Sequence, residues 1–410
     1  MQYVIIGNGI AGVCAAEAIR EIDTESDISM VGDETHPPYG RPMISHVLDG
    51  SVPYENLSIR SANFYEKLSI KPVLGERVTR LDINDKQIQI GEDRWMSFDK
   101  LLIASGADPR PIQADGSHLK NIFYLRTEKD VRQKLKVLSE VRQGLVLGGG
   151  LVGFKAAYAL LKRGLSVTML ITSDYPLSMQ VDKTAGKMIL NELRTLGLKV
   201  EVGTTVAAFE GKNKVEAAVT TNGERIPCDM VVVGKGVLPA HGYISRDKID
   251  IDYGILVDEH LETGVNGIYA AGDVAELIDI ARQRRWVNAI WPEAAMQGRI
   301  AGLNMAGRTV AYPGSLSRNV MRVVNLDVLT IGQANEFQPG NGRTTLTRFD
   351  ARRKTYRRLI FNEDRLIGAV MINHIEQGGV LHALIKNRIP IARPQDALLD
   401  PGFNFRCLMM

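Results

Sequence analysis

YVIIGNGIAG, residues 3–12, is the stretch that decides the fold of this chain. Its first four residues are apolar strand formers, and an alanine-rich helical segment follows the glycines. This order predicts a strand, a tight turn and a helix whose N-terminus faces a pyrophosphate. Gly7 would make the turn, Gly9 would let the pyrophosphate approach, and Gly12 would let helix and strand pack closely. The alternative is a glycine-rich turn that binds nothing.

An acidic residue is expected at the end of the second strand, where it would accept hydrogen bonds from ribose hydroxyls. Residues 27–31 have the composition of that strand, and Gly32, Asp33 and Glu34 follow. The acids lie about 20 residues past the last glycine, as a dinucleotide fold requires. Either Asp33 or Glu34 can fill this role, and the sequence does not distinguish between them.

The same pattern restarts at residue 145, where a short apolar run leads into GGGLVG, residues 148–153. A helical segment at 156–161 and a strand at 166–170 complete the unit, and residues 229–234 read as a further buried strand. Two such units favour two dinucleotides, the alternative being a duplicated fold with one empty site. The expected contacts of the second ligand are Gly148, Gly150, Leu151, Val152, Gly153 and Gly236.

The second unit does not distinguish NAD from NADP. The strand after it ends in Leu170-Ile171-Thr172-Ser173-Asp174, without an acid immediately at the strand end. An arginine suited to a 2′-phosphate is not evident there either.

Length and composition narrow the class of protein. A chain of 410 residues predicts two or three domains, and a net charge of +3 gives no global reason to expect nucleic acid as a partner. We expect no membrane span, because no apolar run reaches about 18 residues. The first strand starts almost at Met1, so a signal peptide is not expected, and a cytoplasmic location is.

The cysteines do not suggest thiol or metal chemistry. Cys14, Cys228 and Cys407 are far apart, so neither a disulfide framework nor a metal clip is expected. Residues 407–410 formally match a prenylation box, which we interpret as coincidence because no polybasic segment lies immediately upstream.

The remaining segments predict strands, loops and a small appendage. Residues 37–45 read as a rigid proline-rich loop, 70–103 as short strands, and Pro292 marks a helix start. From about residue 319, alternating strands and a helix at 379–386 predict a small α+β domain. Within it, a basic hairpin is either a solvated strand pair or a docking surface; it comprises Arg348, Asp350, Arg352, Arg353, Lys354, Arg357 and Arg358.

Six motifs in order resemble the flavoprotein reductases of the pyridine nucleotide-disulfide oxidoreductase superfamily, particularly the NADH:rubredoxin and ferredoxin reductase branch. They are GNGIAG (7–12), PYGRP (38–42), ASGADPRPI (104–112), GGGLVG (148–153), GIYAAGDV (267–274) and WPEAAMQGRIAGLNMAG (291–307). The likeness covers nearly the whole chain.

The resemblance implies that FAD lies along the first fingerprint and the nicotinamide cofactor along the second. Asp273 would bind the ribityl chain, and Arg41 and Pro42 would lie beside the isoalloxazine. A helix N-terminus near Ala294 and Ala295 would place partial positive charge where reduced flavin becomes anionic. The remaining expected FAD contacts are Ala104, Gly106 and Gly272.

Two departures from the family pattern affect the expected chemistry. The superfamily's disulfide and peroxide reductases carry a redox cysteine, and the nearest counterpart here is Asp49, so thiol chemistry is not expected; Cys14 reads as a packing residue. The family also usually has Glu two residues after the last glycine of the second fingerprint, near the nicotinamide, where this chain has Lys155. Lys155 and Trp291 are therefore candidate modulators of the cofactor chemistry.

The function expected from these residues is hydride transfer between NAD(H) and FAD, coupled to single-electron transfer between the flavin and an iron-sulfur protein, with the direction of electron flow left open. That partner would be a rubredoxin, a ferredoxin or the iron-sulfur subunit of a larger complex. Basic candidates for docking it are the hairpin at 348–358 and Arg282, Arg284 and Arg285. Two alternatives remain: an NAD(P)H oxidase or reductase of small oxidants, and a flavin-binding scaffold without turnover.

The expected fold is α/β, with two doubly wound Rossmann-like domains of glutathione-reductase type and a small C-terminal α+β domain. Residues 1–112 and 245–318 would form a discontinuous FAD-binding domain. Residues 113–244 would bind NAD(P), and residues 319–410 would form the C-terminal interface domain.

Overall fold

The computed structural model describes residues 1–335, 342–391, 395–400 and 402–403, so Cys407 and the motif at 407–410 lie outside the described residues. Its contacts divide the chain into two compact units. Unit 1 comprises Met1–Gly40, Leu57–Asp108 and Leu238–Leu316, and unit 2 comprises Arg41–Asn56, Pro109–Val237 and Ser317–Met410. Both units are therefore assembled from three separate stretches of chain.

A parallel five-stranded sheet forms the centre of unit 1, in the order β19-β7-β1-β2-β3. The apolar run before the first glycine turn becomes its middle strand, which is buried along almost its full length, as expected of a strand covered on both faces. The strands are β1 (Gln2–Ile6), β2 (Asp27–Gly32), β3 (Ile70–Leu74), β7 (Lys100–Ile103) and β19 (Ile268–Ala270).

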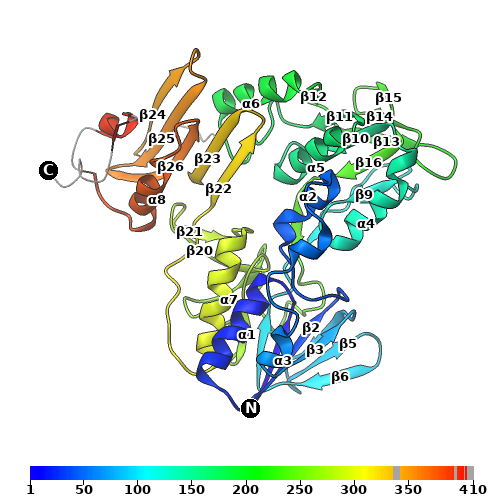
Figure 1. Cartoon of the computed structure of the whole chain (residues 1–410). Helices are drawn as coiled ribbons and strands as arrows, with labels where there is room; N and C mark the ends of the chain where they lie inside the picture. Colours follow the sequence, from blue (N-terminus) through cyan, green and yellow to red (C-terminus); the bar gives the residue numbers. More distant parts are fainter. Residues whose placement is uncertain (336–341, 392–394, 401, 404–410) are drawn as a thin grey trace. The chain divides into compact units, whose positions relative to one another are not determined.

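Two helices of unit 1, α1 (Ile10–Ile22) and α7 (Trp291–Met305), pack against each other, as the blue and yellow ribbons of Figure 1 show. Glycines on α7 make this contact unusually close. A Cβ at Gly298 would lie 2.0 Å from the carbonyl oxygen of Ala11, and one at Gly302 would lie 2.4 Å from that of Ala15. The two helices therefore meet backbone to backbone.

Small sheets and short helices complete unit 1. The antiparallel sheet β4-β5-β6 contains β4 (Val78–Asp82), β5 (Gln87–Ile90) and β6 (Arg94–Ser97). The sheet β18-β20-β21 contains β18 (Ile255–Leu256), β20 (Ala275–Asp279) and β21 (Arg284–Trp286). Helix α3 (Phe64–Lys67) also belongs to unit 1, whereas η2 (Tyr54–Leu57) lies in unit 2 except for Leu57. Strands β8 (Ala107–Pro109) and β17 (Val237–Pro239) pair with each other.

Unit 2 contains a second parallel five-stranded sheet, in the order β12-β11-β10-β16-β9. Its strands are β9 (Ile122–Tyr124), β10 (Gln143–Leu147), β11 (Ser166–Ile171), β12 (Lys199–Val202) and β16 (Met230–Val233). Its helices are α4 (Glu128–Val137), η3 (Leu138–Glu140), α5 (Leu151–Lys162) and α6 (Lys183–Thr195). An antiparallel sheet adds β13 (Val206–Glu210), β14 (Ala217–Thr220) and β15 (Arg225–Pro227).

The segment predicted as a loop at 37–45 is partly helical, so that prediction was wrong over its second half. Arg41–Met43 forms the 3₁₀ helix η1, and Ile44–Asp49 forms α2. The fixed backbone angle of Pro42 suits the first turn of a helix, and Gly50 ends α2 in the left-handed conformation, with φ of 81°.

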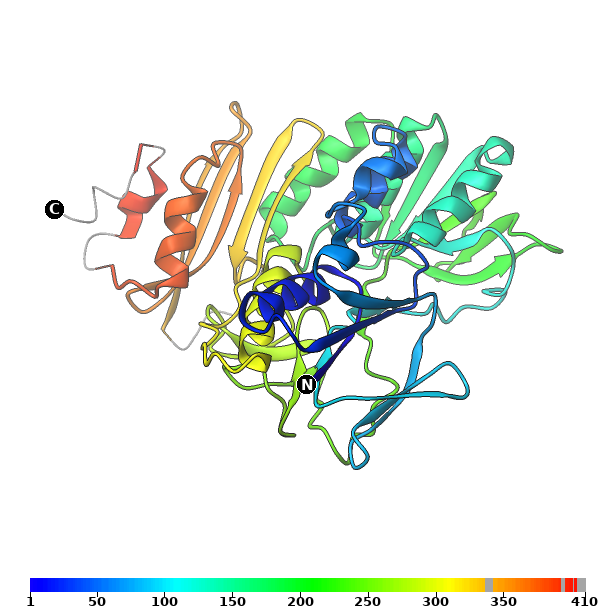
Figure 2. The same cartoon turned by 60° about the horizontal axis from the view of Figure 1, so that its bottom comes forward.

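The C-terminal part of unit 2 is an antiparallel five-stranded sheet in the order β22-β23-β26-β25-β24. Its strands are β22 (Arg318–Val323), β23 (Leu326–Gly332), β24 (Arg343–Asp350), β25 (Thr355–Asn362) and β26 (Arg365–Ile372). Helix α8 (Gly378–Lys386) packs on β26 and β23, and η4 (Gln395–Leu399) follows. Figure 2 shows α8 as an orange helix beside the orange strands of this sheet. The predicted α+β appendage and its hairpin are confirmed.

Buried polar groups join this sheet to α6 within unit 2. The Asp182 carboxylate caps α6 by accepting a hydrogen bond from the Thr184 amide (3.2 Å). The same carboxylate accepts a hydrogen bond from the Tyr356 hydroxyl (2.9 Å) and pairs with Arg358 (3.3 Å). We call Asp182, Tyr356 and Arg358 the clasp.

Lys134 on α4 is fully buried, and its ammonium group donates hydrogen bonds to the carbonyl oxygens of Tyr124 and Asp130. Burial lowers its pKa to about 8, against an ordinary value of 10.5, although Asp130 acts in the opposite direction. The unfolded chain therefore binds one proton more than the folded chain between these two pH values, so stability rises with pH there.

We expect this rise to disappear in a Lys134→Met variant. The free energy of unfolding of the wild type, relative to the variant, should increase by on the order of 1 to 3 kcal/mol from pH 7.5 to pH 10.5. Urea titrations of both proteins at several pH values measure it. If the free energies of unfolding of the two proteins changed with pH in parallel, Lys134 would be in contact with water and the prediction would be wrong.

The predicted fold class is confirmed: two parallel sheets flanked by helices are followed by a C-terminal α+β region. None of the helices within the described ranges combines the length and the apolar character that crossing a bilayer would take.

Candidate functional site

The first glycine turn, at the end of β1, is packed tightly against backbone atoms. Gly7 has φ of 116°, a conformation that residues with a side chain rarely adopt, and a Cβ there would lie 2.0 Å from the carbonyl oxygen of Ala104. A Cβ at Gly12 would lie 2.1 Å from the carbonyl oxygen of Gly7. Both glycines are therefore required by the fold of the turn itself.

The second glycine turn, at the end of β10, repeats this geometry. Gly148 has φ of 110°, and a Cβ there would lie 2.4 Å from the carbonyl oxygen of Gly234. A Cβ at Gly153 would lie 1.9 Å from the carbonyl oxygen of Gly148. The turns of both units thus follow one plan.

The middle glycines, Gly9 and Gly150, differ from their neighbours because a Cβ on either would meet no atom within 4 Å. They stand at the N-cap positions of α1 and α5, and neither helix has a side-chain cap in the part of the chain that the structure describes. Open space before an uncapped helix N-terminus is the cradle that a pyrophosphate needs. The residues at both turns therefore fit a dinucleotide.

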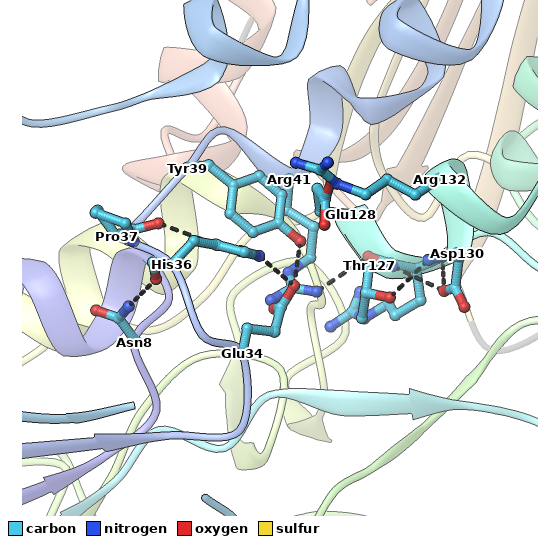
Figure 3. A network of polar contacts seen from close by, with 11 residues as sticks. Asn8, Glu34, His36, Pro37, Tyr39, Arg41, Thr127, Glu128, Asp130 and Arg132 are labelled. Atoms are coloured by element: carbon cyan, nitrogen blue, oxygen red, sulfur yellow. Dashed lines mark hydrogen bonds and ion pairs between the residues drawn. The ribbon is translucent and has the colours of Figure 1, made fainter. Parts of the chain in front are cut away.

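The acids after β2 lie in a polar network next to the first turn, which Figure 3 shows from close by. The Glu34 carboxylate accepts a hydrogen bond from the Tyr39 hydroxyl (2.8 Å) and lies 3.4 Å from His36 Nε2. The Asn8 amide, between the two glycines of the turn, donates to the His36 carbonyl oxygen (3.2 Å). Asp33 is exposed.

Tyr39, His36 and Asn8 were not among the residues predicted for the site. Asn8 was visible in the sequence as the residue between two fingerprint glycines, but its contact with a loop 28 residues away has no local signal. The network holds the glycine turn and the acidic strand end in one arrangement.

Two further predicted backbone stretches lie in unit 1. Ala104 is buried against the first turn, and Gly106 accepts a hydrogen bond from the amide of Ala240 (3.0 Å). Gly272, before Asp273, donates its amide hydrogen to Gln297 Oε1 (2.7 Å). Gln297 is buried on α7 and was also missed, although it belongs to the quoted motif at 291–307.

The first turn of α7 holds Trp291, Ala294 and Ala295, as predicted from the proline at its start. Glu293 in the same turn is buried, and its carboxylate accepts a hydrogen bond from the Tyr312 hydroxyl. This carboxylate near a helix N-terminus is favoured by the helix dipole.

Arg41 and Pro42 belong to unit 2. Arg41 donates a hydrogen bond to the carbonyl oxygen of Arg126 (3.0 Å), and the Pro42 carbonyl oxygen accepts one from Lys155 Nζ (3.2 Å). Burial lowers the pKa of Lys155. The lysine at the position of the family's usual glutamate is thus in contact with the PYGRP motif.

The other residues predicted to contact the second ligand also lie in unit 2. Leu151 and Val152 lie in the first turn of α5, and Val152 is 38% exposed although apolar. Gly236 follows β16 with φ of 91° and open space around it. Asp174, three residues past the end of β11, is exposed.

Of the cysteines in the described ranges, Cys14 is partly buried and Cys228 is buried. Burial raises the pKa of the Cys14 thiol, and it raises that of Cys228 to about 12. The Asp49 side chain is 3% exposed and lies 3.6 Å from Lys162 Nζ. Burial opposes its ionisation, but hydrogen bonds from Ser51 and nearby positive charge keep its pKa below the ordinary value.

Three basic residues of the hairpin contact other parts of unit 2. Arg357 and Arg358 are buried, Arg357 binds the carbonyl oxygens of Leu398 and Asp400, and Lys354 pairs with Glu192 (2.9 Å). Arg348, Arg352 and Arg353 are exposed, beside Phe349, which is 53% exposed. Lys354 is also exposed, although it pairs with Glu192.

The arginines predicted at 282–285 are also partly engaged. Arg282 pairs with the fully buried Asp279 (3.0 Å), and Arg285 donates to the carbonyl oxygens of Val257 and Glu276. Arg284 is exposed, with its guanidinium 5.2 Å from the centre of the Trp286 ring. No group of three histidine, cysteine or acidic side chains that could hold a metal ion occurs in the described ranges.

Two family models match the sequence. Residues 1–298 match the pyridine nucleotide-disulphide oxidoreductase model, and residues 318–389 match the rubredoxin NAD+ reductase C-terminal domain. The second match falls on the antiparallel sheet and α8.

Among curated relatives, the chain is 30% identical over 392 residues to the NADH-dependent phenylglyoxylate dehydrogenase subunit epsilon of Aromatoleum evansii, covering 94% of this chain and 92% of that one. It is 28% identical to the nitrite reductase [NAD(P)H] of Bacillus subtilis over 98% of its own length but only 49% of the relative. The chain thus spans about half the length of that relative.

A solved structure with the same fold is that of the covalent putidaredoxin reductase-putidaredoxin complex. The TM-score is 0.87 at 25% sequence identity, with 95% of this chain and 94% of that chain covered.

Proposed function

We propose, from the premise that this chain belongs to the pyridine nucleotide-disulphide oxidoreductase family, that it transfers electrons from NADH through FAD to an iron-sulfur protein. The observation that carries this proposal is the pair of matching glycine turns, each with an open middle glycine before an uncapped helix. FAD supplies the chemistry when bound, because a flavin accepts a hydride and releases single electrons.

The roles that we propose for unit 1 concern FAD. The turn at Gly7, Gly9 and Gly12 would bind the pyrophosphate through backbone amides, and Asp33 or Glu34 would accept the ribose hydroxyls. Asp273, held through Gln297 and Gly272, would bind the ribityl hydroxyls. The first turn of α7, at Ala294 and Ala295, would stabilise negative charge on the reduced flavin.

Unit 2 would bind the nicotinamide nucleotide at Gly148, Gly150 and Gly153, with Val152 covering it. We favour NADH over NADPH, because the exposed Asp174 after β11 would repel a 2′-phosphate. We also propose that residues 1–112 and 245–318 form the FAD-binding domain and residues 113–244 the NAD-binding domain. Residues 319–410 would form the C-terminal domain.

Anaerobic mixing of the purified yellow protein with NADH tests the proposal. We expect flavin absorbance to bleach within seconds and to do so more slowly with NADPH. Reoxidation by a rubredoxin or ferredoxin should then follow faster than reoxidation by oxygen. A protein whose flavin stays oxidised would be a scaffold, and one that consumes oxygen rapidly without a carrier would be an oxidase; both results contradict the proposal.

The partner is proposed to be an acidic iron-sulfur protein or subunit. This rests on the match of residues 318–389 to the C-terminal domain of rubredoxin reductases and on the exposed arginines of the hairpin. Complementary charge raises the rate of encounter and depends on ionic strength.

Charge reversal at the exposed hairpin arginines should slow transfer to the iron-sulfur acceptor. We expect the triple variant Arg348→Glu, Arg352→Glu, Arg353→Glu to lose on the order of tenfold or more in acceptor reduction at low salt. Reduction of a neutral dye by NADH should stay unchanged, because dye needs no docking. Stopped-flow assays with both acceptors measure this.

The matched control reverses three exposed cations elsewhere on the chain, Lys212, Arg246 and Lys248, which lie in other surface loops. It should reduce the carrier at close to the wild-type rate. Equal losses in both triple variants, or equal losses with dye and carrier, would reject docking at the hairpin.

A further inference from the structure

The segment 41–56 interrupts the sequence of unit 1 but belongs to unit 2. It contains η1, α2 and η2, and α2 lies beside α5, as the blue helix next to the green one in Figure 1 shows. The strands before and after it, β2 and β3, are neighbours in the unit 1 sheet. We call residues 41–56 the arm.

Three cations from one face of α5 and its end hold the arm. Lys155 Nζ donates to the Pro42 carbonyl oxygen (3.2 Å), and Arg163 Nε donates to the Leu48 carbonyl oxygen (2.8 Å). Lys162 pairs with the buried Asp49 carboxylate (3.6 Å). Spacings of seven and eight residues place these cations on the same side of the helix.

The contact of Arg163 is built into the end of α2. The last carbonyl groups of a helix lack partners within it and attract cations. Arg163 binds two of them, Leu48 and, at 3.4 Å, Val47. Gly50 leaves room for the guanidinium, because a Cβ there would lie 2.9 Å from Arg163 Nη2.

Two contacts with the α4 region hold the ends of the arm. Arg41 donates to the Arg126 carbonyl oxygen (3.0 Å). The Arg132 guanidinium lies 5.2 Å from the centre of the Tyr54 ring, within the range of a cation-π contact. The arm is thus attached to the second nucleotide-binding fold at both ends and along α2.

We propose that Lys155 and Arg163 are positioning residues that fix the arm to the helix of the second glycine turn, so that the backbone at Arg41 and Pro42 is set by the fold that binds NADH. The inference rests on the proposed function and on the expectation, implied by the family resemblance, that Arg41 and Pro42 lie beside the flavin. It assigns to Lys155 the role of holding the backbone at Pro42 by donating a hydrogen bond, which a glutamate carboxylate at this position could not do.

The first test measures the arm directly, without turnover. In the FAD-loaded protein without NADH, Lys155→Met and Arg163→Met should each raise amide hydrogen exchange in residues 44–56. The amides of Ser51 and Val52, both bonded to the His46 carbonyl oxygen, report on the end of α2. Lys187→Met, an exposed lysine on α6, is the matched control and should exchange like the wild type.

The second test measures what the arm does. Lys155→Met should slow anaerobic flavin reduction by NADH on the order of tenfold, because small misplacement of reacting groups costs rate steeply. FAD content and reduction by dithionite should be unchanged. Lys155→Arg keeps a donor and should restore most of the rate.

Unchanged exchange in both Met variants would overturn the inference, as would a wild-type reduction rate in Lys155→Met. Equal slowing of Lys187→Met would also overturn it. If Lys155→Met is recovered without FAD, Arg163→Met decides the question by the same two measurements. A wild type that NADH fails to reduce would contradict the proposed function instead, while the exchange result would still test attachment of the arm.

Discussion

A Gly9→Ala variant is expected to fold normally and to lose its FAD. The alanine Cβ would meet no protein atom within 4 Å, and φ at this residue is −88°, so the turn itself accommodates the methyl group. The methyl group would instead occupy the space before α1 where we place the pyrophosphate. We expect FAD affinity to fall on the order of 100-fold, equivalent to about 2.8 kcal/mol.

Flavin content after purification and titration of the apoprotein with FAD measure the loss, and thermal unfolding of the two apoproteins checks the fold. Gly150→Ala is the matched variant in unit 2 and should keep its FAD while raising the KM for NADH. Gly12→Ala should damage folding itself, since its Cβ would lie 2.1 Å from a carbonyl oxygen. A Gly9→Ala protein with wild-type FAD affinity would place the flavin nucleotide elsewhere.

Breaking the clasp should destabilise unit 2 strongly. Asp182→Ala removes the N-cap of α6, the acceptor of the Tyr356 hydroxyl and the partner of Arg358, leaving a buried guanidinium without its carboxylate. Losing one member of a buried ion pair typically costs about 3 to 5 kcal/mol. We expect a lower urea midpoint by far-UV circular dichroism.

Glu224→Ala provides the control, because its carboxylate lies 3.7 Å from Lys199 with both side chains more than half exposed. Such a surface pair should contribute at most about 1 kcal/mol. Asp182→Asn, which keeps a capping oxygen, should fall between the two. If Asp182→Ala were no less stable than Glu224→Ala, the clasp would not hold the C-terminal sheet to α6.

The sequence predicted what local patterns encode. Each glycine turn is specified within about ten residues, so both turns, the parallel sheets around them and the helix start at Pro292 were correctly predicted. The prediction of a loop over 37–45 was wrong in its second half because proline also suits the first turn of a helix. Of the two buried apolar side chains of α2, Ile44 lies within that segment and Leu48 lies after it.

Contacts between residues distant in sequence could not be predicted. Asp182 and Tyr356 are 174 residues apart, and no spacing rule brings them together. The same holds for Lys155 and Pro42, 113 residues apart. Charged residues in a basic hairpin also look alike in the sequence, whether they are buried like Arg358 or exposed like Arg352.

The three-part assembly of unit 1 has a consequence for how the ribosome delivers this protein. Strand β19 and helix α7, which complete the sheet and cover α1, emerge only after all of the intervening nicotinamide fold has been made. Until then α1 lacks its close backbone contact between Ala11 and Gly298. We therefore expect unit 1 to bind FAD only after its last stretch of chain has been synthesised, because α7 and β19 complete it.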